Sequence, residues 1–234
     1  SKFYWSNSFF KKRNANYYKC KLKIGDYNFK GKIRVKGLLL KPWEYENGFF
    51  SYKIKLQDNM LNNLDRFYLN YPKKRNNLQE FYGDHICKYF GLIYQKNHFY
   101  NLEINEVNKG LYLFEEAFDE RLLSHNKRPE GPIIFFTKNN LISMGTENYG
   151  KSFLKSEIIN QFPSKYNKTS KKLLKDFLVK KSSAKEVFDF EKTATQFVLA
   201  DLVGYYHQLN YHNVKFYYNP TTKKIEPIAN DFQF

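Results

Sequence analysis

The segment EKTATQFVLADLVGYYHQLNYHNVKFYYNPTTKKIEPIANDFQF, residues 191–234, carries the pattern that decides the fold. It predicts an apolar helix, a polar loop and a β-hairpin, and it brings His207, Asn213 and Asp231 toward one end of this unit. Phosphoryl-transfer sites place a proton acceptor and two oxygen ligands for Mg²⁺ in such a setting. An ordinary helix packed on a solvated hairpin is the alternative for each of the three residues alone.

The composition is that of a globular chain. Of the 234 residues, 42% are hydrophobic, including 23 Phe and 20 Tyr, so the chain is long enough for one large domain or two lobes. No apolar run reaches the length of a membrane span, and the start lacks the apolar core of a signal peptide. Cys20 and Cys87 lie far apart without a CxxC spacing, which argues against a cysteine metal site and leaves a single disulfide open.

The charge is strongly basic: 39 Lys and Arg against 23 Asp and Glu give a net charge of +16. Such a field attracts nucleic acid, anionic lipid, acidic polymers or phosphorylated ligands. The basic residues are scattered along the sequence, however, and no zinc-finger or RNA-recognition signature accompanies them. We therefore do not expect nucleic-acid binding to be the main role.

The front of the chain predicts a sheet-rich lobe at 1–120. Residues 19–37 alternate around Gly25-Asp26 as a hairpin, and FFSYKIKL and RFYLNY follow as strands. In FFSYKIKL, Ile54 and Leu56 are expected on the face opposite Lys53 and Lys55. A helix is expected from 77 to 90, with Gly91 ending it. HFYNLEINEV and GLYLFEEAF then form two strands joined by a turn at Asn108-Lys109-Gly110. We expect a mixed sheet with one helix laid on it.

The back of the chain, 121–234, predicts a helical lobe. Segment 125–151 has the Gly, Pro and Asn content of a connector, and helices are expected near 152–161, 170–180 and 185–204. The fold class is therefore α+β with two lobes, and ligands commonly bind in the cleft between lobes.

Lys55 and Glu80 are candidates for handling phosphate. A strand lysine can hold the α- and β-phosphates of a nucleotide, and a glutamate on the next helix can orient that lysine. An exposed lysine and a solvated glutamate near a helix start are the alternatives. Glu115 and Glu116 end a strand. Backbone groups at such a position can bind an adenine edge, and a strand end that reaches solvent is the alternative.

The loop after the long helix does not favour zinc. His207 and His212 are five residues apart, unlike the four of a helical zinc pair. Asn213 and Asp231 offer oxygen ligands, which suit Mg²⁺ better. Asp231 is equally placed to be a turn residue.

With these residues in view, the chain resembles the CotH family of spore-coat-protein-H-like atypical protein kinases from about residue 32 to the end. IRVKG and FFSYKIKL are similar to conserved strands of the family, and LDRFYLNYPKKRNNLQEF to its strand–turn–helix segment. GLYLFEE matches its G-x-Y-x-x-x-E pattern, with Gly110, Tyr112 and Glu116. HNVKFYYNPTTKKIEPIANDF resembles its asparagine–hairpin–aspartate ending.

The resemblance implies a divergent two-lobed protein-kinase-like fold that binds ATP with Mg²⁺ or Mn²⁺ and phosphorylates protein serine or threonine hydroxyls. It places Lys36, Lys55, Glu80 and Glu116 at the cofactor. Lys55 is the phosphate-binding lysine with Glu80 as its partner, and Glu116 marks the hinge. Asn213 and Asp231 are the implied metal ligands. Family membership points loosely to a bacterial envelope or secreted setting.

Two departures from the family pattern bear on activity. Many members have an aspartate a few residues after the glycine that matches Gly204, where this chain has His207 or Gln208, and the nearest carboxylate is Asp201. A histidine can accept a hydroxyl proton near neutral pH, so His207 and Asp201 are the catalytic candidates. Gln233 replaces a second aspartate, which leaves a pseudokinase, a binding module or a basic polymer-binding protein as alternatives.

Overall fold

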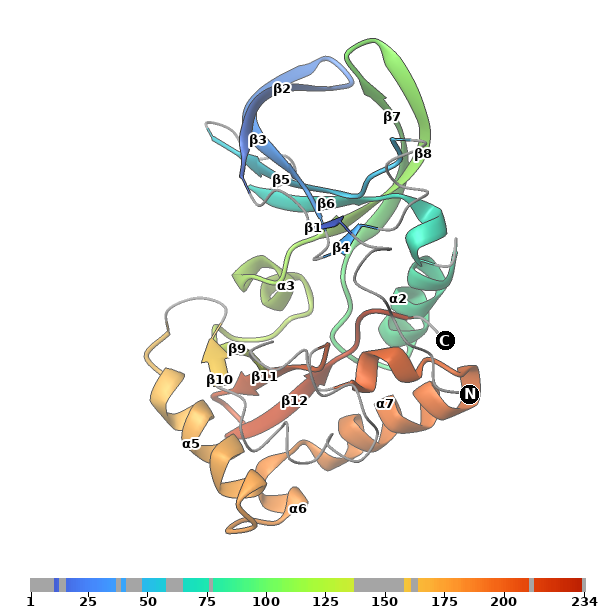
Figure 1. The fold of residues 1–234 in the computed structure, drawn as a ribbon. Helices are drawn as coiled ribbons and strands as arrows, with labels where there is room; N and C mark the ends of the chain where they lie inside the picture. Colours follow the sequence, from blue (N-terminus) through green and yellow to red (C-terminus); the bar gives the residue numbers. More distant parts are fainter. Residues whose placement is uncertain are drawn as a thin grey trace. The chain divides into compact units, whose positions relative to one another are not determined.

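The chain divides into two compact units, one formed by residues 1–77 and 97–117 and the other by residues 78–96 and 118–234. A computed structural model describes residues 11–12, 16–36, 39–40, 48–57, 65–75, 78–136, 158–160, 164–210 and 213–232. The fold is α+β, and Figure 1 shows a curled sheet in the first unit and helices around a smaller sheet in the second. In these described ranges, no helix has the length and apolar character needed to cross a membrane.

The first unit is a six-stranded sheet in which every neighbouring pair is antiparallel. Its strands, in spatial order, are β2 (Tyr18–Ile24), β3 (Tyr27–Val35), β5 (Tyr52–Leu56), β6 (Arg66–Asn70), β8 (Val107–Glu116) and β7 (Asn97–Ile104). The prediction of a mixed sheet is therefore wrong. Short hairpins join β2 to β3 and β7 to β8, and such a hairpin makes an antiparallel pair. The other three pairs are antiparallel as well. The helix expected on this sheet groups with the second unit. Smaller elements are the paired strands β1 (Lys11–Lys12) and β4 (Leu39–Leu40), and the 3₁₀ turn η2 (Pro72–Arg75).

Alternation of side chains gives the sheet one apolar face. In β5, Tyr52, Ile54 and Leu56 are buried while Lys55 is exposed, as the sequence predicted. Residues directly opposite one another on antiparallel strands point to the same face, so the register extends this apolar face across the sheet. Its core consists of Phe29, Tyr52, Ile54, Leu56, Phe67, Leu69, Tyr112 and Phe114.

The two long hairpins differ in how well the sequence located their turns. Gly25 takes φ of 57° at the predicted turn between β2 and β3. The β7–β8 turn lies at Asn105-Glu106, with φ of 50° and 65°, and not at the predicted residues 108–110. Asn accepts the left-handed conformation that such a turn needs. Gly110, with φ of 77°, lies within β8 opposite Leu102, where the pairing register shifts.

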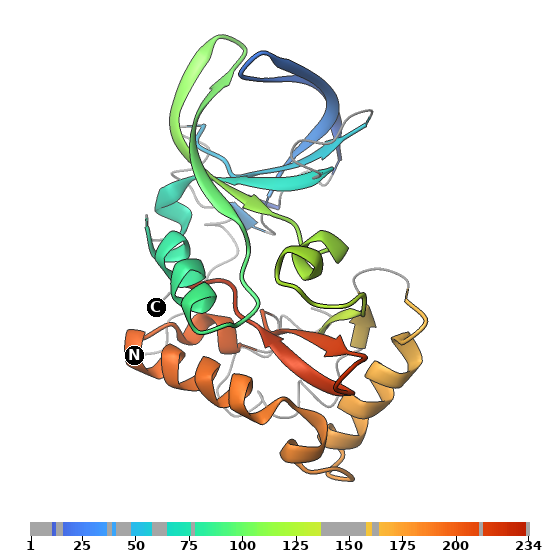
Figure 2. The same cartoon turned by 180° about the vertical axis from the view of Figure 1, so that it is seen from behind.

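The second unit contains a four-stranded antiparallel sheet. The order is β10 (Ile158–Asn160), β9 (Ile133–Phe136), β11 (Lys215–Asn219) and β12 (Lys224–Ile228). The hairpin of β11 and β12 is the one predicted near the end of the chain. In Figures 1 and 2, α7 (Phe190–Val203) runs alongside this hairpin.

Strand pairing corrects two predictions in this unit. Ile133–Phe136 lies in the expected connector but forms β9, because its four residues are apolar, three of them are buried, and the strand pairs with β10 and β11. Residues 158–160 of the helix expected at 152–161 form the strand β10, paired to β9. The rest of that expected helix, and residues 137–151 of the connector, lie outside the described residues.

The remaining helical elements belong to the second unit. They are α2 (Gln79–Tyr89), α3 (Glu120–His125), α5 (Asn167–Leu178), α6 (Ala184–Val187) and the 3₁₀ turn η4 (Tyr206–Leu209). The helix expected at 185–204 is split, because Ser183 caps α6 and Asp189 caps α7 in the second turn of the predicted helix. Gly91 ends α2 with φ of 68°, as predicted.

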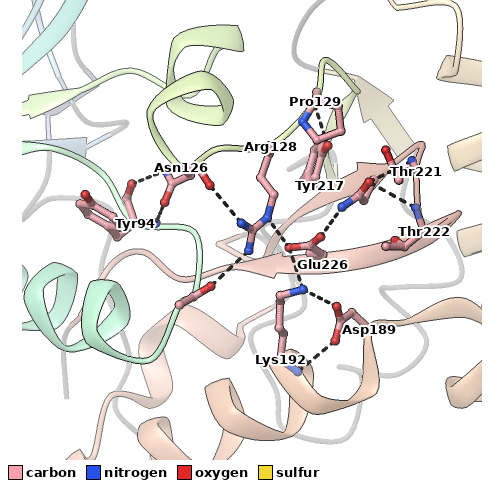
Figure 3. A network of polar contacts seen from close by, with 12 residues as sticks. Tyr94, Asn126, Arg128, Pro129, Asp189, Lys192, Tyr217, Thr221, Thr222 and Glu226 are labelled. Carbon is pink, nitrogen blue, oxygen red and sulfur yellow. Dashed lines mark hydrogen bonds and ion pairs between the residues drawn. The ribbon is translucent and has the colours of Figure 1, made fainter.

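A buried polar network lies between the hairpin and the helices of the second unit (Figure 3). Glu226 on β12 is fully buried, and its Oε2 accepts from Nε of Arg128 at 2.8 Å. The guanidinium also donates to the carbonyl oxygens of Asn126 and Gly91. A buried carboxylate is stable only when it is paired and hydrogen-bonded, so Arg128 joins the ends of α2 and α3 to the hairpin.

The same carboxylate reaches α7. Lys192 lies 3.4 Å from Oε2 of Glu226 and also pairs with Asp189. Asn219 on β11 donates to Oε1 of Glu226 at 2.7 Å. The network therefore fixes the start of α7 against the hairpin whose far end carries Asp231.

Candidate functional site in the second unit and polar cluster in the first

Glu80, in the first turn of α2, holds the backbone that carries Asp231. Its side chain is buried, with 1% exposure. Oε1 accepts from the backbone N–H of Asp231 at 3.0 Å, and Oε2 accepts from that of Phe232 at 3.2 Å. Asp231 has φ of 61°, a left-handed conformation uncommon outside glycine. The two hydrogen bonds stabilise this conformation, so Glu80 determines where the Asp231 side chain lies.

A close approach between α2 and the tail supports this contact. A Cβ added at Gly83 would lie 2.2 Å from the ring of Phe232, so only glycine allows the ring to pack there. Cys87, one turn later, belongs to the same apolar cluster as Phe232. Burial raises the pKa of the Cys87 thiol, and the charges of Asp84 and Glu80 raise it further. Cys87 is thus a packing residue and not a nucleophile.

His207, Asn213 and Asp231 meet, as the sequence predicted. Nδ1 of His207 lies 2.7 Å from Oδ2 of Asp231. Nδ2 of Asn213 donates to the carbonyl oxygen of His207 at 3.0 Å and lies 3.1 Å from its Nδ1. A carboxylate at Nδ1 favours the tautomer that carries its proton there. In that tautomer Nε2 is the basic nitrogen of the ring.

The oxygen groups of this cluster suit a hard cation better than zinc. Among the described residues, no three His, Cys, Asp or Glu side chains form a group that could hold a metal ion. The available donors are the Asp231 carboxylate and the Asn213 amide. Asn230 beside them is 5% exposed, and its Oδ1 has no hydrogen-bond partner within the described part of the chain. Mg²⁺ is commonly bound through one or two carboxylates with several waters, so this donor set fits it.

The other catalytic candidates lie in different surroundings. Asp201 is exposed on α7 and accepts a hydrogen bond from the hydroxyl of Tyr206 at 2.7 Å. This bond raises the pKa of Tyr206. Gln208 is buried and pairs with Gln196 on α7 at 3.0 Å. Of these residues, only His207 contacts Asp231 in the described part of the chain. His212 and Gln233 lie outside the described residues.

The first unit has a polar cluster of its own, on the face of the sheet opposite its apolar core. Lys36, just after β3, donates to Oδ1 of Asn70 at 2.8 Å and lies 3.6 Å from Oε1 of Glu115. Asn70 donates in turn to Oε2 of Glu115. Asn70 and Glu115 are 0% and 2% exposed. The Lys36 ammonium is therefore fixed by two buried partners.

The lysines of this face divide between two tyrosines. Nζ of Lys36 lies 4.2 Å from the ring centre of Tyr68, and Nζ of Lys53 lies 5.0 Å from it. Lys55 instead lies 5.0 Å from the ring centre of Tyr17 and is exposed. Lys36 is thus the predicted cofactor residue that enters a buried network, whereas the role of Lys55 as partner of Glu80 stays a prediction.

Glu115 and Glu116 point to opposite faces. Glu116 pairs with Phe67 in the register and continues the apolar face of Tyr112 and Phe114. Both glutamates are buried, so the alternative of a strand end in solvent is wrong. The assignment of Glu116 to a hinge stays a prediction.

The sequence reasoning missed Asn70 and Glu115 as partners of Lys36. Alternation alone predicts that Glu115 points away from the apolar face, because it lies one residue out of phase with Tyr112, Phe114 and Glu116. The pairing of β6 with β8 brings Asn70 beside it, and no local pattern reports that pairing.

Searches for related proteins found no protein-family model that matches the chain and no match among curated proteins.

Proposed function

We propose that the chain is a kinase-like phosphotransferase of the CotH type, which passes the γ-phosphoryl group of ATP to a protein serine or threonine hydroxyl. The observation that carries the proposal is the meeting of His207, Asn213 and Asp231, with the backbone of Asp231 held by Glu80. Phosphoryl transfer depends on positioning and charge neutralisation more than on reactive side chains. A rigidly held histidine–carboxylate pair beside an amide meets that need.

In this proposal Asn213 and Asp231 hold Mg²⁺ or Mn²⁺, which when bound neutralises charge on the phosphates. Asp231 also orients His207 through Nδ1. Nε2 of His207 accepts the hydroxyl proton as the hydroxyl oxygen forms its bond to the γ-phosphorus. The bond between that phosphorus and the bridging oxygen breaks, and ADP leaves with the electron pair.

Lys36 and Lys55 are the lysines that the family resemblance implies as partners of the nucleotide phosphates. Lys36 is the stronger candidate because Asn70 and Glu115 fix its ammonium group, whereas Lys55 is exposed. The kinase-like fold itself is part of the proposal. Its support is the order of the elements: antiparallel strands, α2 with its buried glutamate, then helices, a polar loop and a hairpin.

The test is phosphoryl transfer from γ-labelled ATP to a serine-rich acceptor protein, with Mg²⁺ and then with Mn²⁺. We expect Asp231→Asn and His207→Gln each to lower the rate at least about 100-fold. The matched control is Asp176→Asn on α5, an exposed carboxylate that pairs with Lys172, and it should transfer at the wild-type rate. Equal labelling by wild type and Asp231→Asn would remove Asp231 from the mechanism.

A second experiment separates His207 from Asp201 as the proton acceptor. Asp201→Asn removes the carboxylate but keeps an oxygen that can accept from the Tyr206 hydroxyl, and it should leave transfer nearly unchanged if His207 is the base. A loss with Asp201→Asn as large as that with His207→Gln would move the role to Asp201.

A nucleotide-binding pseudokinase is the second candidate. The sequence favours it at Gln233, which stands where a second aspartate is common, because one fewer carboxylate weakens a metal site. Thermal melting with ATP and Mg²⁺ distinguishes the two: stabilisation without turnover favours the pseudokinase.

A further inference from the structure

Several of the basic residues that are scattered along the sequence lie together on one face of the first unit. β2, β3 and β5 contain no acidic residue, and their lysines alternate with apolar residues. Six exposed lysines share the face opposite the apolar core. They are Lys19, Lys21, Lys23, Lys30, Lys32 and Lys55, called here the lysine face.

The strand register arranges these lysines in rows. Lys19 lies opposite Lys32, which lies opposite Lys55. Lys21 lies opposite Lys30 in the next row. Like charges directly opposite on neighbouring strands are destabilising. Across the described residues, none of the six forms an ion pair. The sheet thus tolerates a repulsion that an anionic ligand would relieve.

Aromatic rings accompany the charge. Tyr17, just before β2, is half-buried and lies under the guanidinium of Arg34 and the ammonium of Lys55. Tyr68 lies on the same face, one strand beyond Lys53. Surfaces that bind single-stranded nucleic acid combine a basic track with aromatic rings on which bases stack.

The spacing of the lysines fits the phosphates of a single strand. Lysines two residues apart on one strand are about 6.8 Å apart, which is the rise of about two nucleotides of a stacked strand. Each ammonium is a compact point charge with three rotatable donors, so it can bind the phosphates of a flexible strand without a fixed planar geometry.

We propose that the lysine face, with Tyr17 at its side, binds single-stranded nucleic acid through its phosphate backbone without sequence preference. This inference is independent of the proposed phosphotransfer, because it rests on residues of the first unit that the mechanism does not use, apart from Lys55. Its failure would leave the role of Asp231 unaffected.

The test is fluorescence anisotropy of a labelled oligothymidine of about 20 nucleotides, titrated with the whole chain between about 50 and 200 mM salt. The triple variant Lys19→Gln, Lys21→Gln, Lys32→Gln removes three charges of the lysine face. Each phosphate contact contributes about 0.7 to the slope of log K against log salt for a single strand, so the slope should fall by about 2.

The matched control removes three exposed lysines from the second unit: Lys168→Gln, Lys175→Gln, Lys185→Gln. Both triple variants have the same net charge, and circular dichroism checks that both are folded. The control should keep the wild-type salt slope. An equal fall of the salt slope in both variants would show that net charge alone determines binding, and it would overturn the proposal.

Tyr17→Ala examines the aromatic part separately. It should weaken binding of oligothymidine about tenfold by removing a stacking ring, with the salt slope unchanged because no charge is lost. Equally tight binding of a duplex would overturn the single-stranded assignment. Equally tight binding of polyglutamate would identify the ligand as an acidic polypeptide, and equally tight binding of vesicles containing phosphatidylserine would identify it as a lipid surface. If the wild type does not bind oligothymidine, the proposal is wrong.

Discussion

The two units differ in how their polar residues are brought together. In the first unit, the strand register does this, because the pairing of β6 with β8 places Asn70 beside Glu115. In the second unit, the candidate site depends on a hydrogen bond between residues 151 positions apart, Glu80 and Asp231. The difference implies that the cluster of the first unit depends on the register of whole strands, whereas the site of the second unit depends on a few individual hydrogen bonds.

The largest expected effect is at Arg128 in the second unit. Arg128→Ala leaves the fully buried carboxylate of Glu226 without its closest cation, and breaking a buried pair costs about 3 kcal/mol or more of unfolding free energy. Urea unfolding followed by helical circular dichroism measures the loss, since the described α-helices belong to the second unit.

Lys172→Ala is the control for Arg128→Ala, because it removes an ion pair that is exposed on α5. Exposed ion pairs contribute little to the free energy of unfolding, so the urea midpoint of Lys172→Ala should stay near that of the wild type. Equal losses in the two variants would show that the Arg128 network does not hold the second unit together.

A smaller effect is expected where α2 meets the tail. Gly83→Ala places a methyl group 2.2 Å from the ring of Phe232, which should lower the unfolding free energy by about 1–2 kcal/mol despite the better helix propensity of alanine. The same change in a Phe232→Leu background should cost less, because the ring is gone. A double-mutant cycle measures the coupling, and additive effects would contradict this packing.

The two cysteines provide a chemical comparison of the units. Cys20 on β2 is half-buried, whereas Cys87 on α2 is 2% exposed. Burial raises the pKa of both thiols, and the buried thiol should react with Ellman's reagent at least about tenfold more slowly at pH 8. Cys20→Ser should remove the faster phase. Two equally fast thiols in the native protein would show that the α2–tail contact opens readily.

The smallest expected effect is the pH dependence at Asp189. Burial raises the pKa of its carboxyl, but the hydrogen bonds and charge of Lys192 outweigh this, so the pKa lies below its ordinary value. A lowered folded-state pKa stabilises the protein above the ordinary value near 3.9, and this contribution disappears as pH falls through the folded-state pKa.

Asp189→Asn keeps a capping side chain at the start of α7 and removes the charge. The variant should melt slightly below the wild type at pH 7, and the two should converge below about pH 4. A constant difference from pH 7 to pH 3 would rule out the charge of Asp189 as its cause.

Local patterns predicted the elements better than their partners. Alternation located the strands and the buried side of β5, and Gly25 and Gly91 marked a turn and a helix end. The turn at Asn105-Glu106 was missed because Gly110 is the stronger turn signal in the sequence, and it moved the prediction to residues 108–110. Asn105 adopts the left-handed conformation of the turn without a glycine. The strand β10 was missed because β9, not its own sequence, stabilises it.

The candidate site shows the same division. His207, Asn213 and Asp231 were predicted because they lie within 25 residues of one another. The attachment of Glu80 to the tail, the network of Lys36 and the gathering of lysines on one face depend on which strands and helices are neighbours. Composition and periodicity carry no information about those neighbours.

The central claim is that Asp231, fixed by Glu80, forms with Asn213 an oxygen site for a divalent metal with ATP. Electron paramagnetic resonance of Mn²⁺, titrated with protein and ATP, measures that site directly. The account predicts Mn²⁺ binding that strengthens with ATP and weakens at least about tenfold in Asp231→Asn, but not in Asp176→Asn. Identical Mn²⁺ binding by wild type and Asp231→Asn would contradict it.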